Sequence, residues 1–243
     1  MSHLVLSDHH VRVSYSVPRR RPGWDLSEET KPESIPHDLA VELLKAILAH
    51  FAATVRKTAF VARNLAVRWD EQNPSVGVDP DVCLLDPAPP GVQDLTSLRT
   101  WLPGHVTPQL AVEVVSENNP KKDYSIAPDK YGAAGVRELW VFDPLLAGPS
   151  AHGGPYRLQT WVREGDEFFR THAADAPAFS PLLEAWLVPS ADGRLLRIAD
   201  DRDGNHPWPT AEEAERAERD AERAAKEAAL ARVAELEAEL RRR

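Results

Sequence analysis

Apolar residues recur at helical spacing between His37 and Ala53, which is the clearest periodic signal in the chain. An α-helix with one apolar face has this pattern. The recurring residues are Leu39, Leu43, Leu44, Ile47, Leu48 and Phe51. Pro36 precedes the segment, and Asp38 lies in its first turn, where a negative charge suits the helix dipole. The pattern predicts a helix over 37–53.

Shorter apolar runs, separated by turn residues, predict strands in the middle of the chain. They are Ala59–Trp69, a strand from Val76, a strand around Glu113, Glu138–Asp143, and a hairpin of Tyr156–Trp161 with Phe168–Thr171. The turn after Trp69 predicts that the first two strands pair antiparallel. A helix expected over Pro128–Ala134 separates the Glu113 strand from the next, which predicts a right-handed crossover and a parallel pair. The expected fold class is α/β, with a mixed central sheet flanked by helices.

A proline-rich loop lies between Asp86 and Pro108 and contains Leu95, Leu98 and Trp101. Two interpretations stay open: the loop folds over the entrance of a site, or it forms a surface for a partner.

The composition changes to Ala, Glu and Arg from about Thr210, and Thr210 with Glu213 has the spacing of a capping box. Small residues then follow one side of a long predicted helix: Ala214, Ala217, Ala221, Ala224, Ala228 and Ala231, after which the seam moves to Val233, Leu236 and Leu240. Such a seam predicts a coiled coil and a homodimer through this helix. Alanine buries little area, so a solvated helix held by Glu–Arg pairs is the competing interpretation.

The length of 243 residues suggests one domain with appendages. We expect a flexible N-terminal segment (1–31), a domain (32–200), and a linker with the charged C-terminal helix (201–243). In the first segment, the alternation of Val11, Val13 and Tyr15 suggests a short edge strand, and the cluster 19–21 suggests a nucleic-acid-binding arm. A solvated leader is the simpler interpretation.

Composition excludes several classes of protein. The single cysteine, Cys83, excludes an internal disulfide framework and a cysteine-rich zinc site. No run approaches the roughly 18 apolar residues of a membrane span, and the first residues lack a signal-peptide core. We therefore expect a cytoplasmic protein without membrane contact. Proteins that bind DNA usually neutralise its phosphates with an excess of Lys and Arg, whereas this chain has a net charge of −9. The charge weakens the case for DNA as a partner without excluding it.

Two acids interrupt otherwise apolar strands: Asp81 after Pro80, and Glu113 between Val112 and Val114. Burying a lone carboxylate is costly. Two carboxylates at about 4 Å repel each other by roughly 4 kcal/mol at an effective dielectric of 20. Mg²⁺ or Mn²⁺ removes this penalty, because hard cations prefer oxygen ligands. The competing interpretation is a solvated acid on a wet sheet face. Apolar neighbours on both strand faces favour a metal site, with a carbonyl near Val114 as a further ligand.

The stretch Val76–Pro144 resembles the Uma-two family, whose members are described as restriction endonucleases of the PD-(D/E)XK nuclease superfamily. The resemblance depends on Pro80-Asp81, the strand LAVEVVS, Asp123, Tyr131 and the segment GVRELWVFDP. It extends weakly to the helix near His37 and to FSPLLEAW near Phe179. It implies a restriction-endonuclease-like fold, with Asp81 and Glu113 as the metal-binding acids. Asp123 then matches an acid in the loop after the strand, and Tyr131 a tyrosine in the following helix.

One departure concerns the lysine of the superfamily motif, which Val115 replaces here. Family members commonly supply a lysine from the following helix, at the position that Ala127 holds in this chain. Lys130 lies three residues further, on the same helical face, and is our first choice for a catalytic lysine. Lys121 and Lys122 in the loop are the other candidates. In the first helix, Glu42 and His37 are the residues that could approach the site.

The expected function is that of a metal-dependent endonuclease that hydrolyses nucleic-acid phosphodiester bonds, with DNA as the expected substrate. Asp81 and Glu113 would hold Mg²⁺ or Mn²⁺, and a lysine would act on the attacking water. The alternative is a nuclease fold that no longer cleaves and that assembles through its C-terminal helix. The missing motif lysine favours this alternative, and the presence of both acids opposes it.

Overall fold

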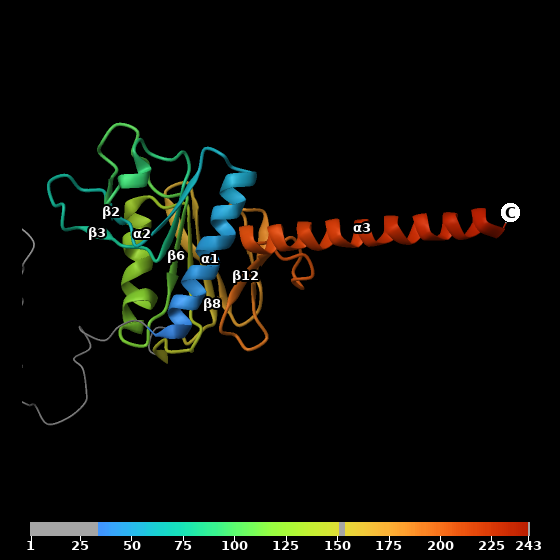
Figure 1. Cartoon of the computed structure of the whole chain (residues 1–243). Coiled ribbons are helices and arrows are strands. Elements are labelled where there is room, and N and C mark those ends of the chain that lie inside the picture. The colour runs from blue at the N-terminus through green and yellow to red at the C-terminus, as the bar shows by residue number, and fades with distance from the viewer. Residues whose placement is uncertain (1–33, 151–153, 243) are drawn as a thin grey trace, which may run out of the picture. The chain divides into compact units, whose positions relative to one another are not determined.

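A six-stranded mixed β-sheet forms the centre of the protein in the computed structural model, which describes residues 34–150 and 154–242 (Figure 1). Its strands are β1 (Phe60–Arg63), β4 (Val82–Leu85), β6 (Leu110–Val114), β7 (Glu138–Phe142), β8 (Leu158–Glu164) and β9 (Glu167–Ala174). They lie side by side in the order β1-β4-β6-β7-β8-β9. The predicted α/β class with a mixed central sheet is confirmed.

Strand directions follow the connections between the strands. β6 and β7 run parallel, with Glu113 beside Val141, as the helical crossover predicted. The other neighbouring pairs are antiparallel. Between β8 and β9 the chain turns at Gly165, whose φ of 59° is left-handed and suits glycine. The predicted hairpin is therefore confirmed, with strands longer than expected.

The two faces of the sheet carry separate hydrophobic clusters, because side chains alternate along each strand. Val112 and Val114 face the cluster formed with helix α1 (Ile35–Thr54). The same cluster includes residues of a three-stranded sheet, β10 (Ala178–Ser180), β11 (Ala185–Pro189) and β12 (Leu196–Ala199). Ala111 and Val115 face the opposite cluster, which includes helix α2 (Ala127–Ala134). Figure 1 shows α1 and α2 on opposite sides of β6.

Helix α1 begins after Ser34, whose Oγ accepts a hydrogen bond from the N–H of His37. Such a side-chain acceptor satisfies one of the free N–H groups of the first turn. The buried side of the helix is formed by His37, Ala40, Val41, Leu44, Ile47, Leu48 and Ala52. Leu39 was predicted on this side but is 57% exposed. The predicted helix is confirmed, and its buried face is rotated away from Leu39 because Ala40 and Val41 pack against the sheet.

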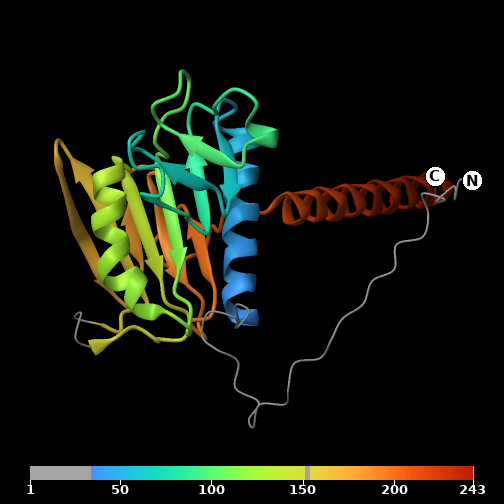
Figure 2. The ribbon, with the colours of Figure 1, turned by 90° about the vertical axis from the view of Figure 1, so that its left-hand side faces the viewer.

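Two predicted strands are each divided in two. The prediction of one strand over Ala59–Trp69 is wrong, because Asn64 takes a left-handed conformation (φ 51°) between β1 and β2 (Ala66–Arg68). The strand expected from Val76 is divided at Pro80-Asp81 into β3 (Gly77–Val78) and β4. β2 pairs antiparallel with β3, as expected for that turn, and also pairs parallel with β5 (Ser97–Arg99). Figure 2 shows this small sheet beside the central one.

The proline-rich loop contains β5 and a 3₁₀ turn, η2 (Val92–Asp94). Its residue Leu98 is buried in the cluster on the α2 face of the central sheet. The loop therefore adds to that side of the domain.

A π-helix, η3 (Lys122–Ile126), leads directly into α2 where the sequence predicted a loop. α2 has a proline in its first turn, where the missing N–H is harmless, and ends at Gly135 with a left-handed φ of 82°. The predicted Pro128–Ala134 helix is confirmed. π-Helical turns are rare and are frequent at functional sites, so η3 is a feature that needs an explanation.

The last element is α3 (Ala211–Arg242), a 32-residue helix. Its start confirms the predicted capping box: Thr210 N–H donates to Glu213 Oε2, and Glu213 N–H donates to Thr210 Oγ1. Within the described part of α3 only Ala214 is partly buried. Over all residues that the structure describes, no helix has the length and apolar composition that crossing a membrane requires. The edge strand suggested at Val11–Tyr15 and the arginine arm 19–21 lie outside the described residues.

Candidate active site

Glu113 lies in the middle of the sheet, in the fully buried strand β6, with 3% of its surface exposed. It points to the α2 face together with Ala111 and Val115, because side chains alternate along a strand. The hydroxyl of Tyr131, from α2, donates to Glu113 Oε1 at 2.5 Å. The ammonium of Lys122, from η3, lies 3.5 Å from Glu113 Oε2. Residues of β6, α2 and η3 therefore meet at this carboxylate.

Asp81 lies where the pairing between β4 and β6 stops. The last pair of that ladder joins Val82 and Val112. Beyond it, Asp81 Oδ2 accepts a hydrogen bond from the N–H of Val114 at 2.8 Å. His37 Nε2, from the first turn of α1, lies 3.4 Å from the same oxygen. The carboxylate of Asp81 thus takes the place of a strand partner for β6, at Val114, the residue that follows Glu113.

Asp123 and Lys122 reach the same place from η3. Asp123 is 2% exposed, and its Oδ1 lies 3.5 Å from Lys122 Nζ. Among the described residues, none donates a hydrogen bond to this buried oxygen. The side chain of Lys122 is 47% exposed, so this lysine contacts two buried acids and is also accessible from the solvent.

Of the other predicted site residues, Lys130 lines the same cavity as Glu113, and Glu42 lies outside it. Lys130 Nζ donates to the main-chain oxygen of Gly77 in β3 at 3.4 Å, while its side chain lines a small cavity of about 90 Å³ together with Glu113, Lys122 and Ala127. Glu42 forms an ion pair with Arg63 and has a side chain 65% exposed. Of the candidate lysines, the structure brings Lys122 to the acids, and Lys130 stands at the rim of their cavity.

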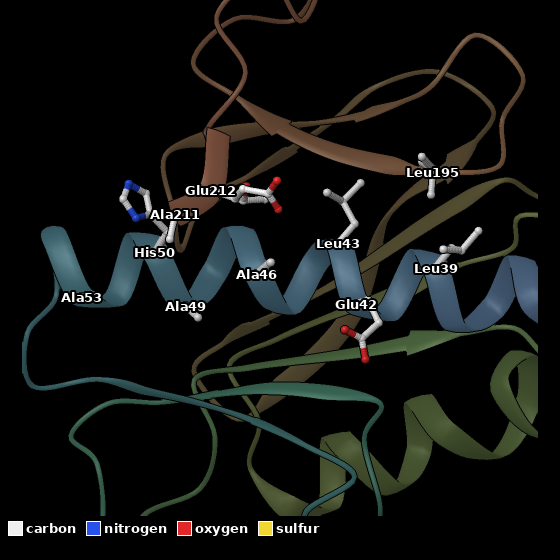
Figure 3. A pocket seen from close by; sticks show the side chains of 11 residues that line it. Leu39, Glu42, Leu43, Ala46, Ala49, His50, Ala53, Leu195, Ala211 and Glu212 are labelled. Carbon is white, nitrogen blue, oxygen red and sulfur yellow. The ribbon is translucent and has the colours of Figure 1, made fainter. Parts of the chain in front are cut away.

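One groove is separate from the acids. It has a volume of about 670 Å³ and runs along the outer side of α1 to the start of α3. Figure 3 shows its lining, with Leu39 and Leu43 on α1, Leu195 on the facing segment, and Glu212 at the start of α3. The small cavity lined by Glu113, Lys122 and Lys130 is therefore our candidate active site.

Comparison with known proteins identifies the family. The family model described as "Uma2: Putative restriction endonuclease" matches residues 27–166, which are 140 of the 243 residues. The chain belongs to the Uma2 family. The description of this family supports a nuclease role and implies a nucleic-acid substrate. No curated protein matches the chain.

Four chains of solved structures are similar to this Uma2 protein. One is titled "Crystal structure of a putative nuclease belonging to DUF820 from Anabaena variabilis ATCC 29413 at 1.96 A resolution". It has 13% sequence identity and a TM-score of 0.42, and the match covers 62% of this chain and 74% of that chain. The family assignment depends on the family model and not on this distant similarity.

Burial and mutual repulsion shift the protonation of the acids in this Uma2 site. Burial is the main cause that raises the pKa of Glu113 to about 8, and the charges of Asp123 and Asp81 add to it. Burial likewise raises the pKa of Asp123 to about 7, against the opposing effect of Lys122. The same acids raise the pKa of the Lys122 ammonium above its ordinary value, despite partial burial. At neutral pH the site therefore holds protons that a bound cation would displace.

The residues present fit a divalent ion, on which restriction-endonuclease-like families generally depend. Within residues 34–150 and 154–242, no three or more His, Cys, Asp or Glu side chains are gathered closely enough to hold a metal ion. A pair of carboxylates is nevertheless the usual protein share of a Mg²⁺ site, which keeps several waters. The buried Oδ1 of Asp123 has the Lys122 ammonium as counter-charge at 3.5 Å and accepts no hydrogen bond from the described residues, so it is free to accept one from a water of the ion.

Sequence reasoning ranked Lys122 below Lys130 because the segment before α2 was expected to be a loop. The signal that could have favoured Lys122 was its position directly before Asp123, an acid already assigned to the site. Val115, which replaces the motif lysine, is buried in the hydrophobic cluster on the α2 face. No lysine can therefore come from that position.

Proposed function

We propose that this Uma2 protein is a divalent-metal-dependent endonuclease that cleaves DNA at a PD-(D/E)XK-type site. The observation that carries the proposal is the meeting of Glu113 with Lys122 and Asp123, with Asp81 close enough for its charge to act on both buried acids. Burying Glu113 and Asp123 around one lysine is costly for stability. Perturbed acids in a cavity are typical of functional sites.

Asp81 and Glu113 would hold Mg²⁺ or Mn²⁺, and the main-chain oxygen of Val114 is our candidate for a third ligand. In an extended strand the N–H and C=O of one residue point to the same edge. The N–H of Val114 donates to Asp81, so its oxygen is directed to the same side. A bound ion would supply Lewis-acid polarisation of the scissile phosphate and a more acidic water.

Lys122 is the residue we assign to charge stabilisation at the phosphate. Its side chain is half exposed and ends 3.5 Å from both Glu113 and Asp123, so it can face a substrate in solvent. A fixed ammonium stabilises the negative charge that develops on the phosphoryl oxygens. The Tyr131 hydroxyl keeps Glu113 oriented, and His37 lies beside Asp81. Asp123 holds Lys122 from the other side.

The competing function is a nuclease fold that binds without cleaving, and that assembles through α3. The burial of Val115 at the motif-lysine position favours this alternative. The two functions differ in what Mn²⁺ should do. The endonuclease nicks supercoiled plasmid DNA in the presence of Mn²⁺, whereas the binding module leaves the plasmid intact.

The first experiment is plasmid nicking by the purified full chain with Mn²⁺. Asp81→Ala and Glu113→Ala should each abolish nicking, and EDTA should do the same. Activity that survives both substitutions would show that another site or a contaminant is responsible.

The second experiment tests which lysine acts. Lys122→Met should lower kcat by about 10²- to 10³-fold, the usual effect of losing one charge-stabilising group. Lys121→Met, at the neighbouring exposed lysine, is the matched control and should keep wild-type activity. Adding Ala127→Lys to Lys122→Met returns a lysine to the position used by other members, beside Glu113 in the same cavity. We expect this double variant to recover part of the lost activity. Loss of nicking in Lys130→Met, with full activity in Lys122→Met, would assign the role to Lys130 instead.

A further inference from the structure

We propose that Tyr124 is a positioning residue, anchored on Asp143 and on the main chain of Tyr156, that sets where Lys122 and Asp123 stand at the site. This inference rests on the proposed function for its effect on catalysis. Its effect on the position of Lys122 can be measured without any activity.

The hydroxyl of Tyr124 is held from three sides. It accepts a hydrogen bond from the N–H of Tyr156 at 2.9 Å. It also lies 2.9 Å from Asp143 Oδ2 and 3.0 Å from the carbonyl oxygen of Tyr156, and its single proton serves one of these two acceptors. The anchor thus joins η3 to the end of β7 and to the segment that enters β8.

Asp143 is itself fixed, because it has no exposed surface and accepts two main-chain hydrogen bonds. The N–H of Ala147 donates to Oδ1 at 2.9 Å, and the N–H of Gly148 donates to Oδ2 at 2.8 Å. A buried carboxylate with this many donors has little freedom to move. The acceptor that receives Tyr124 is therefore rigid.

The ring of Tyr124 fills a space that only glycine leaves open. A Cβ atom placed on Gly148 or on Gly154 would overlap the ring. Two glycines from the segment after β7 thus form a cradle around one tyrosine. The close approach of the two glycines fixes both the position and the orientation of the Tyr124 ring.

This anchor matters because Tyr124 follows Lys122 and Asp123 directly in the π-helix. The side chains of Lys122 and Asp123 are directed to Glu113, whereas Tyr124 is directed to Asp143. A π-turn holds one more residue than an α-helical turn and needs tertiary contacts to persist. Relaxation of η3 to α-helical spacing would rotate Lys122 and Asp123 relative to α2 and Tyr131. Holding Tyr124 in its cradle prevents this rotation.

A purely structural tyrosine would stabilise the fold without affecting the site, and the test separates the two roles. Tyr124→Phe keeps the ring in the cradle and removes only the hydroxyl. The control is Thr160→Val, which removes another buried hydroxyl, one that pairs with Thr171 in the β8–β9 hairpin at 2.9 Å.

We expect Tyr124→Phe to lower kcat for plasmid nicking by about 10- to 100-fold, since a misplacement of about 1 Å can have this effect. KM for DNA should stay within about twofold, and Thr160→Val should keep the wild-type kcat. If Tyr124→Phe keeps kcat within twofold, or if both variants lose activity in proportion to their unfolded fraction, the positioning role is refuted.

The second readout is the pKa of Lys122, followed by NMR on protein with ¹³C-methylated lysines and assigned with Lys122→Arg. The neighbouring acids raise this pKa in the wild-type protein. Tyr124→Phe should return it toward the ordinary value, and Thr160→Val should leave it raised. An unchanged pKa in Tyr124→Phe contradicts the anchor. If the wild-type chain never nicks DNA and Tyr124→Phe still lowers the pKa of Lys122, the anchor is supported and the endonuclease is refuted.

If Tyr124→Phe shows no cooperative unfolding transition, Gly148→Ala replaces it. Its added methyl group displaces the ring while the hydroxyl remains. The same loss of the raised Lys122 pKa is expected, and an unchanged pKa overturns the proposal.

Discussion

Replacing Glu113 by glutamine should stabilise the metal-free protein at alkaline pH. The folded protein raises the pKa of Glu113 from its ordinary 4.5 to about 8, chiefly through burial. Between these two values the folded protein keeps a proton that the unfolded chain releases. The stability of the wild-type protein therefore falls as the pH rises through this window. Glutamine is neutral at every pH and does not have this cost.

The size of the gain follows from the shift. A change from 4.5 to about 8 corresponds to about 5 kcal/mol at about 1.4 kcal/mol per pKa unit. Glutamine keeps an oxygen that accepts from Tyr131, and the attraction of Lys122 is already contained in the value of about 8, because it lowers this pKa. The expected stabilisation is therefore the full amount of about 5 kcal/mol at pH 9. At pH 4 the two proteins should be nearly equal, since glutamic acid is then neutral as well.

Urea denaturation in EDTA at pH 4 and at pH 9 measures this difference. Glu167→Gln, at an exposed position in β9, is the control and should change stability by less than about 0.5 kcal/mol at either pH. If Glu113→Gln is less stable than the wild-type protein at pH 9, the carboxylate is not held at an electrostatic cost. The physical reason for placing a cation beside it would then be lost.

Three further predictions use other parts of the structure. Glu113, with a pKa of about 8, must lose its proton before it can bind Mn²⁺. The Mn²⁺ affinity measured by calorimetry should therefore rise about 50-fold from pH 6 to pH 8, and binding at pH 7 should release about 0.9 proton. An affinity that does not depend on pH would contradict this. Glu138→Ala leaves Trp140 Nε1 and the N–H of Leu182 without their acceptor. It should lower the free energy of unfolding in urea by about 2–4 kcal/mol and leave kcat of the folded fraction unchanged. A selective loss of kcat would place Glu138 in the site. In gel filtration, the full chain should elute as a dimer and a chain ending at Pro209 as a monomer; equal behaviour of the two would exclude pairing through α3.

Much of the fold could be predicted because it depends on local patterns. Strand alternation placed Glu113 on the face of Ala111 and Val115, and the helical crossover gave the parallel pair of β6 and β7. The capping box at Thr210 depends only on residues within one turn, so it was also predictable. These features need no information about distant parts of the chain.

The features that sequence reasoning missed depend on tertiary contacts. The choice of Lys130 over Lys122 assumed α-helical spacing from Ala127 onward and a loop before it. The π-helix η3 brings Lys122 to the acids, which is why we propose it in place of Lys130, and the contacts of Tyr124 that hold η3 come from Asp143 and Tyr156. The break at Asn64 is similar, because its N–H pairs with the carbonyl of Pro80 in a remote turn. Neither contact leaves a periodic signal in the sequence.

In the proposed site, Asp81 and Glu113 share one divalent ion. A crystal soaked in Mn²⁺ above pH 8, where most Glu113 side chains have lost their proton, tests this directly through the anomalous signal of the metal. We expect one strong peak within coordination distance of both carboxylates, absent in Glu113→Gln. No peak there, or a peak that persists in Glu113→Gln, would contradict it.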